Sequence, residues 1–532
     1  MSYRARRAGT HRRQPIDLTN HTGYKLPMAT SRLQRCVPAF PFAAQGSVFR
    51  PRVVNFVNFA GACVGLALLP GGCALMPPYA RPPAPIPAAY PAPGVPAPGV
   101  PAASVPAATA DVPALGYTTA FGDPRLIALI DRALAYNRDL AASVARVAEA
   151  RAQFRIVRAA QLPAFGGNAA TTAARTSGVA RGGSTAATDY RYATVQLGVT
   201  AFELDFWGRV RALSAAARAR YLATEQARRA YQLSLIQQTA TAWFSSRSLA
   251  ERLALAQRAI ASRREAVRIA KLRLDAGVTS ALDYTQTLVL LQQAQTEAAI
   301  LERSRAQADN LLLTLTGGPA PGTPQPEPLP IFAPAQIADV APGLPSALLA
   351  NRPDIAAAEE TLIAANASIG AARAAFFPQI SLTAAAGFAS GSLAGLFGAN
   401  GFTYTVGPSA TLPIFDFGRT RANLAFARAT AAEASATYQR TIQTAFEEVA
   451  DALAGRRWLA EQLAAQESAL AAQRTRARLA NLRYKNGVAG YLEVLDAERD
   501  LFAAEQAVVD VRGQQLANAA QLYVALGGGA VR

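Results

Sequence analysis

Two long stretches of the chain carry apolar residues at helical spacing. Residues 208–275 contain no proline and no glycine after the first position, and residues 418–486 match them with a single internal glycine, Gly455. Apolar residues recur every seven positions from 253 to 274, and the same spacing recurs from 463 to 484. A repeat of seven predicts coiled-coil packing between neighbouring helices, each about 100 Å long at about 1.5 Å per residue.

Each long stretch is preceded by a shorter alanine-rich segment, at 127–160 and at 346–375, whose apolar positions also fit a helix. A proline, Pro163 or Pro378, follows each segment. Proline has no backbone N–H for the helical hydrogen bond, so each helix is predicted to stop there.

Between these helices the period changes from helical to alternating. Polar and apolar residues alternate at 194–201, 380–384 and 402–407, which predicts strands with one apolar and one polar face. A glycine-rich segment divides each region. We therefore expect two strands within about 164–204 and two within about 379–414, the first of the four having the weakest pattern.

The order of short helix, two strands, long helix and return helix occurs twice. Landmarks of the first copy return 210 residues later, for instance Gly277-Val278 as Gly487-Val488. These glycines predict turns, after which each long helix returns as a second helix and completes a helical hairpin. The sequence therefore predicts an internal two-fold structural repeat with a hairpin tip in each half.

The N-terminal residues have the order of an export signal. An uncharged apolar run at 53–69 follows Arg50 and Arg52 and precedes Cys73. The run has 17 residues, the lower limit for a membrane span, and no stop-transfer segment follows it in the sequence. Residues 1–72 are therefore predicted to be an upstream extension and a signal peptide.

The segment that ends at Cys73 (LPGGC, 69–73) resembles a bacterial lipoprotein box, in which the cysteine thiol receives a diacylglycerol. The resemblance implies lipidation of Cys73, with Cys63 as the alternative position. Thirteen prolines between Cys73 and Pro113 exclude a helix and favour extended polyproline geometry. Residues 73–116 are therefore predicted to be a lipid-anchored, proline-rich tether.

Charge and residue usage narrow the possible chemistry. Residues 1–72 hold 10 Lys and Arg against one acid, and the rest of the chain holds 43 basic and 34 acidic residues that are interspersed rather than gathered on one stripe. This arrangement argues against nucleic-acid binding. All cysteines and histidines lie at or before Cys73. The folded part of the chain therefore lacks the residues for His/Cys metal sites and for catalysis by Cys or His, and we expect no enzyme activity, no cofactor and no metal site. Catalysis by carboxylates alone is the remaining alternative, and the sequence shows no paired acids in a recognisable frame for it.

Four short strands cannot close a membrane barrel alone, because such barrels need about eight strands or more. Open strand edges are not tolerated in lipid. If the strands lie in a membrane, several copies of the chain must complete one barrel, and the long helices would continue the tube away from it. A soluble coiled-coil scaffold with a small capping sheet is the alternative.

Several longer motifs are specific enough to indicate a family. They are NRPDI at 351–355, IGAARAAFFP at 369–378 and LDFWGR at 204–209. These motifs resemble the outer-membrane efflux proteins of the TolC family, in particular its NodT-like lipoprotein branch. The resemblance covers about residues 73–528.

The resemblance implies an α+β membrane protein that forms a homotrimer. Each chain would give four strands to one twelve-stranded outer-membrane β-barrel above a long periplasmic α-helical barrel of coiled-coil hairpins. The first repeat would occupy 117–318 and the second 344–528, with a linker at 319–343 and a tail at 529–532. The protein would be the passive exit duct for drugs and other small toxic molecules in a Gram-negative tripartite efflux system, with a periplasmic adaptor protein and an inner-membrane RND transporter as partners.

The resemblance also implies roles for residues near the hairpin tips. Aspartates form an acidic ring at the tunnel entrance in this family, and the matching positions are Glu493 and Asp496 in the second copy and Asp283 in the first, where the neutral Gln286 matches Asp496. Such a ring disfavours anions and binds cations. Ala489 stands where some relatives carry an arginine that latches the closed mouth.

The adaptor protein is expected to dock on the tips themselves, at Gly277, Val278, Gly487 and Val488. A type I protein-secretion duct is the alternative within the family. A non-transporting periplasmic coiled-coil scaffold is the alternative outside it.

Overall fold

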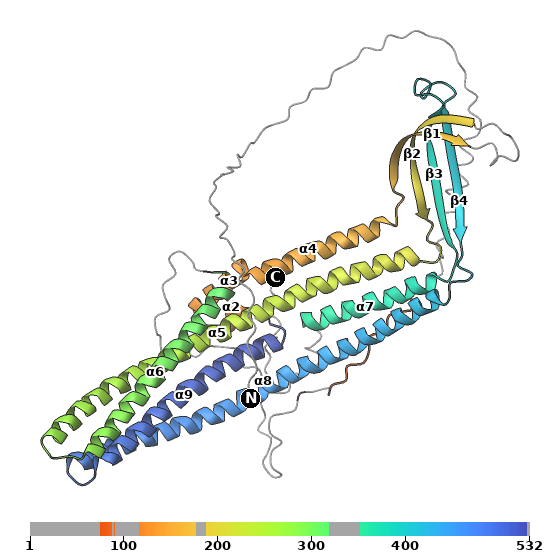
Figure 1. The fold of residues 1–532 in the computed structure, drawn as a ribbon. Helices are drawn as coiled ribbons and strands as arrows, with labels where there is room; N and C mark the ends of the chain where they lie inside the picture. Colours follow the sequence, from red (N-terminus) through yellow and green to blue (C-terminus); the bar gives the residue numbers. More distant parts are fainter. Residues whose placement is uncertain (1–74, 88–89, 91–115, 177–187, 319–351, 529–532) are drawn as a thin grey trace, which may run out of the picture. The chain divides into compact units, whose positions relative to one another are not determined.

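The computed structural model describes residues 75–87, 90, 116–176, 188–318 and 352–528, which all belong to one unit of the chain, Gly71–Arg532. Cys63, Cys73, the linker 319–343 and the tail 529–532 lie outside the described residues. The elements in chain order (Figure 1) are α2 (Tyr117–Ala120), α3 (Pro124–Tyr136), α4 (Arg138–Ala159), β1 (Phe165–Thr176), β2 (Thr188–Glu203), α5 (Arg209–Asp275), α6 (Ala281–Leu315), α7 (Pro353–Ala374), β3 (Gln379–Ser390), β4 (Phe402–Thr411), α8 (Arg419–Lys485) and α9 (Tyr491–Ala525).

The long helices begin and end where the glycines predict. α5 and α8 each have 67 residues, and the return helices α6 and α9 each have 35. Gly208 and Gly418 precede the long helices with φ of 73° and 87°, a left-handed conformation that a residue without Cβ adopts at little cost. The predicted long helices and their return helices are confirmed.

The first short helix differs from its prediction. A single helix over 127–160 is wrong, because the chain breaks at Asn137 into α3 and α4. Asn137 has an extended backbone, its side-chain oxygen accepts a hydrogen bond from the Leu140 N–H (2.8 Å), and its amide donates to the Leu315 carbonyl (3.0 Å). Asn137 therefore caps α4 and ties the break to the end of α6.

Helix packing produces two larger apolar clusters. One joins α3 to α5, α6 and α9 around the buried side chains of Ile130, Ile236 and Trp243. The other joins α7, α8 and the end of α9 around Val449 and Leu526. α5 packs against α4, α6, α7 and α9, and α8 packs against α7 and α9. The hairpin of α5 and α6 and the hairpin of α8 and α9 are therefore held to each other within one chain.

The four predicted strands form one antiparallel sheet in the order β1-β2-β3-β4. The central pair, β2 with β3, joins strands from the two halves of the chain. Glycines allow this close pairing: a Cβ on Gly387 would lie 2.1 Å from the Val195 carbonyl oxygen, and one on Gly198 would lie 2.4 Å from the Ala384 oxygen. β1 and β4 are the edges, and each has one side without a paired strand among the described residues.

Trp207 fixes the passage from the strands to the long helix. Its ring stacks on Phe377 with the centroids 4.6 Å apart, and its Nε1–H donates to the Pro378 carbonyl oxygen (2.8 Å). The end of α7 is therefore bound to the segment that joins β2 to α5. Among the described helices, none has both the length and the apolar character required to cross a membrane.

The segment before α2, here named the strap, comprises residues 75–87 and Tyr90 and contacts α7 and α8. Arg81 binds both carboxylate oxygens of Glu359 on α7, each at 2.7 Å. Tyr90 is buried and stacks on Phe446 of α8, with the ring centroids 4.8 Å apart. The strap contains no helix, as its prolines predict.

Candidate functional site at the hairpin tips

The two hairpin tips share one backbone geometry. Gly277 and Gly487 have φ of 69° and 72° directly after the long helices. The Val278 N–H donates to the Arg273 carbonyl (2.8 Å), and the Val488 N–H donates to the Arg483 carbonyl (2.9 Å), as in a Schellman turn. Val278 and Val488 are 65% and 69% exposed, although both are apolar. The structure thus presents the four predicted docking residues on the surface, and their contact with an adaptor stays a prediction.

Asp283 serves the local structure of the first tip. It occupies the third position of α6 and forms a capping box with Ser280: the Asp283 N–H donates to the Ser280 hydroxyl (3.1 Å), and the Ser280 N–H donates to the Asp283 carboxylate (3.3 Å). The Thr279 hydroxyl donates to the same carboxylate oxygen (2.9 Å). Hydrogen bonds from Ser280 and then Thr279 hold the pKa of Asp283 below its ordinary value, so this carboxylate is charged at neutral pH.

Glu493 and Asp496 lie one turn apart on α9 at the second tip, and each has an arginine partner within its own hairpin. Arg483 donates to Glu493 (3.0 Å), and Arg499 lies 3.2 Å from Asp496. Gln286, the counterpart of Asp496, lies on α6. Within one chain, Asp283 lies at the first tip and Glu493 and Asp496 lie at the second. A ring of these acids would require further copies of the chain, so the ring stays a prediction.

An aromatic contact that the sequence reasoning missed joins the two tips. The Arg273 guanidinium of α5 donates to the Tyr484 hydroxyl of α8 and lies 5.6 Å from the centre of the Tyr484 ring. Tyr484 also contacts Tyr491 of α9, with the ring centroids 4.9 Å apart. The sequence did contain an indication of this contact. In the seven-residue repeat, the second copy has a tyrosine, Tyr484, at the apolar position that Leu274 holds in the first copy.

Farther from the tips, a buried arginine lies between the hairpins. Arg263 is 5% exposed, its guanidinium donates to the Leu290 carbonyl (2.7 Å), and it lies 5.3 Å from the Phe502 ring centre. Burial raises the pKa of Glu498 on α9, and the charge of Arg263 opposes this shift. Arg263 follows the buried Ala256 by seven residues, which places a charged residue among the positions where the repeat predicts apolar packing. This unusual position could have identified Arg263 from the sequence.

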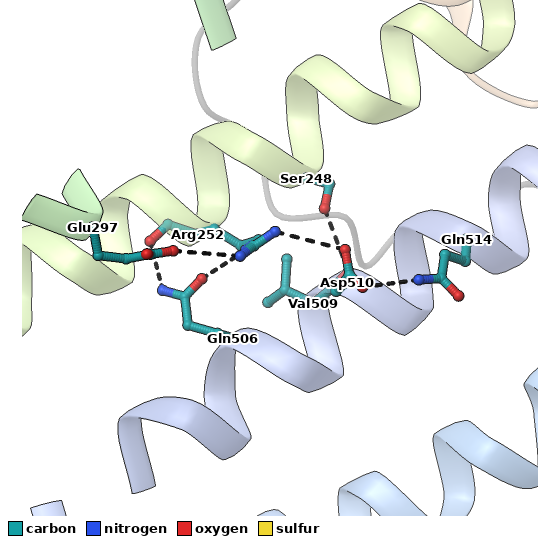
Figure 2. Close-up of polar contacts among 7 residues, drawn as sticks. All are labelled: Ser248, Arg252, Glu297, Gln506, Val509, Asp510 and Gln514. Carbon is teal, nitrogen blue, oxygen red and sulfur yellow. Dashed lines mark hydrogen bonds and ion pairs between the residues drawn. The ribbon is translucent and has the colours of Figure 1, made fainter. Parts of the chain in front are cut away.

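A second polar group, here named the Arg252 cluster, connects α5 with α9 and α6. Its members are Ser248, Arg252, Glu297, Gln506, Val509, Asp510 and Gln514 (Figure 2). Arg252 donates through Nε to Gln506 (2.7 Å), and the Gln506 amide returns a hydrogen bond to the Arg252 carbonyl (2.9 Å). The Arg252 guanidinium also lies 3.5 Å from Glu297 and 3.6 Å from Asp510. The cluster therefore ties the first hairpin to the second through one arginine.

The chain matches the family model described as outer membrane efflux protein in two segments, residues 129–318 and 344–528. It is 42% identical over 464 residues to the solvent efflux pump outer membrane protein SrpC of Pseudomonas putida, covering 87% of this chain and 96% of the relative. It is 38% identical over 475 residues to the outer membrane protein OprJ of Pseudomonas aeruginosa, covering 88% of this chain and 96% of the relative.

Solved structures show the same fold. The MtrE outer membrane channel of Neisseria gonorrhoeae, in its open state, matches with a TM-score of 0.76 and 36% identity, covering 86% of this chain and 98% of that one. A membrane protein from Pseudomonas aeruginosa matches with a TM-score of 0.77 and 37% identity at the same coverage. With its family model matched in both halves and nearly full-length relatives, the chain belongs to the outer membrane efflux protein family.

Proposed function

We propose that this chain is the exit duct of a tripartite efflux system in the outer membrane of a Gram-negative bacterium. Relatives are named as outer membrane proteins of solvent, toluene and antibiotic efflux pumps. By this likeness the substrates are drugs and other small toxic molecules, which pass through without chemical change. An inner-membrane RND transporter would supply the energy, and a periplasmic adaptor protein would join it to the duct.

The observation that carries the proposal is the open sheet. β1 and β4 leave two edges unpaired within the described part of the chain, and a sheet in lipid tolerates no free edge. Three copies would remove all the edges if β4 of each chain paired with β1 of the next. The product is one twelve-stranded barrel, above the minimum of about eight strands.

Exposed apolar side chains beside both edges support assembly from several copies. Phe415 and Phe417, which follow β4, are 91% and 105% exposed, and Phe426 on α8 is 74% exposed. Phe165 at the start of β1 and Ile156 on α4 are 80% and 66% exposed. Contact between copies would remove both groups from water, and burial of such side chains stabilises an interface by about 1.5–3 kcal/mol each.

Matched element lengths support the internal repeat on which this assembly depends. α4 and α7 have 22 residues each, β1 and β3 have 12 each, and the long and return helices are equal in pairs. The family model also matches once in each half. Each chain would therefore supply two equivalent hairpins to the helical tube.

The remaining assignments rest on the resemblances found in the sequence. Glu493, Asp496 and Asp283 from three chains would form the acidic entrance ring, where a negative field favours cations over anions. The exposed tips at Gly277-Val278 and Gly487-Val488 would receive the adaptor. An acyl group on Cys73 would anchor the chain to outer-membrane lipid.

The test begins with the full-length protein isolated from outer membranes of a Gram-negative host. Its mass and its single-channel conductance in planar bilayers are measured together. We expect a trimer with a small conductance that rises when Glu493 and Asp496 are both replaced by alanine, whereas Glu302→Ala, at an exposed position of α6, leaves it unchanged. A soluble monomer without conductance would support the coiled-coil scaffold instead.

A second arm distinguishes efflux from type I protein secretion. The chain is expressed with a matched RND transporter and adaptor in a strain that lacks its own duct, and drug susceptibility is compared with export of a protein substrate. Restored drug resistance supports the proposal. Protein export without restored resistance contradicts it.

A further inference from the structure

Two tyrosines lie next to each other near the start of β2. Tyr190 and Tyr192 are 42% and 43% exposed, and their rings are nearly parallel, with 9° between the ring planes and 6.1 Å between the centroids. β2 begins at Thr188, and its other end leads into α5. The tyrosine pair therefore lies at the end of β2 that is remote from the long helix.

The pairing register divides the sheet into two faces. Residues that pair across neighbouring strands point to the same side of a sheet. Leu197 of β2 pairs with Ala386 of β3, which pairs with Tyr404 of β4. Leu197 and Tyr404 are 71% and 69% exposed, and Phe165 and Val406 on the same side are 80% and 61% exposed. This side, here named the apolar face, therefore presents large apolar side chains to its surroundings.

Tyr190 and Tyr192 belong to the opposite side, here named the polar face. Successive residues of a strand point to opposite sides, so the two tyrosines share a side with Gln196 and not with Leu197. Other polar members of this face are Asn168, Thr172, Thr194, Thr383, Thr403 and Thr405. Membrane barrels turn the apolar side to lipid and the polar side to the pore. This inference rests on the proposed function, under which the polar face lines the pore.

Small neighbours leave the two rings open to that pore. The register places Ala174 of β1 opposite Tyr190 and Thr172 opposite Tyr192. Neither side chain extends as far from the sheet as a tyrosine ring. Over the residues that the structure describes, no guanidinium lies over either ring. The aromatic faces are therefore accessible to a ligand in the pore.

The charged residues beside the pair lie on the apolar face. Asp189 and Arg191 alternate with the two tyrosines along β2, and Arg175 of β1 lies opposite Asp189 at 3.8 Å. Charged side chains on the lipid side of a barrel are tolerated near the membrane surface and not at its centre. Under the proposed function, the tyrosine pair therefore lies at the outer mouth of the pore.

We propose that Tyr190 and Tyr192 bind aromatic organic cations as these leave the duct. The three pairs of a trimer face one pore. The negative face of a tyrosine ring attracts a cation, and the aromatic body of the ligand packs against the same rings. A quaternary ammonium group has no N–H to satisfy, so it suits a wall of tyrosine, threonine and alanine that offers no carboxylate. The acidic entrance ring proposed above favours the same charge.

The experiment measures block of single-channel current by benzyltrimethylammonium chloride. All channels carry Glu493→Ala and Asp496→Ala, which remove the entrance acids as a second cation site. On this background, Tyr190→Leu/Tyr192→Leu removes the aromatic faces and Tyr190→Phe/Tyr192→Phe keeps them. Tyr404→Leu is the matched control, because it changes an exposed tyrosine of the apolar face. We expect the half-blocking concentration to rise about tenfold in the double leucine variant and to stay unchanged in the other two.

Equal block of the double leucine variant and its background would overturn the proposal, as expected if the pair belonged to an aromatic belt in contact with lipid. Phenylmethanesulfonate, an anion of similar size, should block every channel weakly, and a tyrosine-dependent block by this anion as strong as that by the cation would also overturn it. If the double leucine variant does not assemble, Tyr192→Leu alone should raise the half-blocking concentration about threefold. A background channel that conducts without a tyrosine-dependent block refutes this inference alone, whereas a protein without conductance refutes the proposed duct as well.

Discussion

Replacing Arg252 by methionine tests whether one arginine holds the two hairpins together. Methionine keeps the apolar stem and removes the charge. The hydrogen bond to Gln506 at 2.7 Å is worth about 1.5–3 kcal/mol because its donor is charged. The contacts with Glu297 and Asp510 at 3.5 and 3.6 Å, to partly exposed carboxylates, add about 1 kcal/mol at most. The change should therefore destabilise the contact between α5 and α9 by about 2–4 kcal/mol.

Hydrogen–deuterium exchange of the purified trimer reports this loss locally. The amides of α9 around Gln506 should exchange about 30-fold faster or more, since each 1.4 kcal/mol of local opening energy corresponds to about tenfold. Gln506 is 8% exposed and would be left with an unpaired acceptor. A second change, Gln506→Leu, should therefore restore part of the protection in the double variant.

Arg258→Met provides the matched control, because Arg258 is an exposed arginine on the same helix. It should leave the exchange of α9 unchanged. If α9 exchanges no faster in Arg252→Met than in this control, the apolar contacts alone hold the hairpins together and the reasoning is refuted.

Three smaller changes test the tip, the sheet and the helix break. The Ser280 hydroxyl is the main group that lowers the pKa of Asp283, so the capping of α6 is present above about pH 4 and is lost as the pH falls further. Asp283→Asn should abolish this pH dependence, measured as amide hydrogen exchange at the first tip and corrected for intrinsic exchange rates. Gly387→Val should prevent trimers on gels, whereas Gly407→Ala, where a Cβ meets nothing within 4 Å, should not. Asn137→Ala should cost about 1–3 kcal/mol and lower the melting temperature.

Local backbone chemistry explains why most elements could be predicted. The glycines at 208, 277, 418 and 487 need no partner to favour left-handed backbone, so they mark helix ends in the sequence itself. The break at Asn137 was missed although asparagine is a favoured N-cap, because the residues on both sides of it keep the helical spacing. Its cap on the Leu140 N–H is local, and its bond to the Leu315 carbonyl on α6, which the sequence does not show, holds the turn in place.

The polar contacts between hairpins were less accessible to sequence reasoning. Arg263 falls on the apolar seam and so could be recognised as unusual, but its acceptor on α6 and its aromatic partner on α9 depend on how three helices pack. A groove between α4, α5 and α7, lined among others by Phe154, Ala215 and Ile363, could not be predicted, because its residues come from three segments about 50 to 200 residues apart. Family resemblance placed the acids near the tips, and only the structure gave Asp283 its capping partner.

The ion pair within the second tip is more exposed than the arginine contacts between the hairpins. Arg263 is buried, and the Arg252 side chain is only 25% exposed, so breaking either contact leaves desolvated polar groups. At the tips, Arg483 and Glu493 are 55% and 39% exposed, and such pairs contribute about 0–1 kcal/mol. Movement of the hairpins should therefore begin at the tips, where the Arg273 guanidinium and the Tyr484 ring must separate, and meet a larger resistance at Arg263, before it reaches the Arg252 cluster. An entrance built in this way can widen while the helices nearer the sheet remain packed.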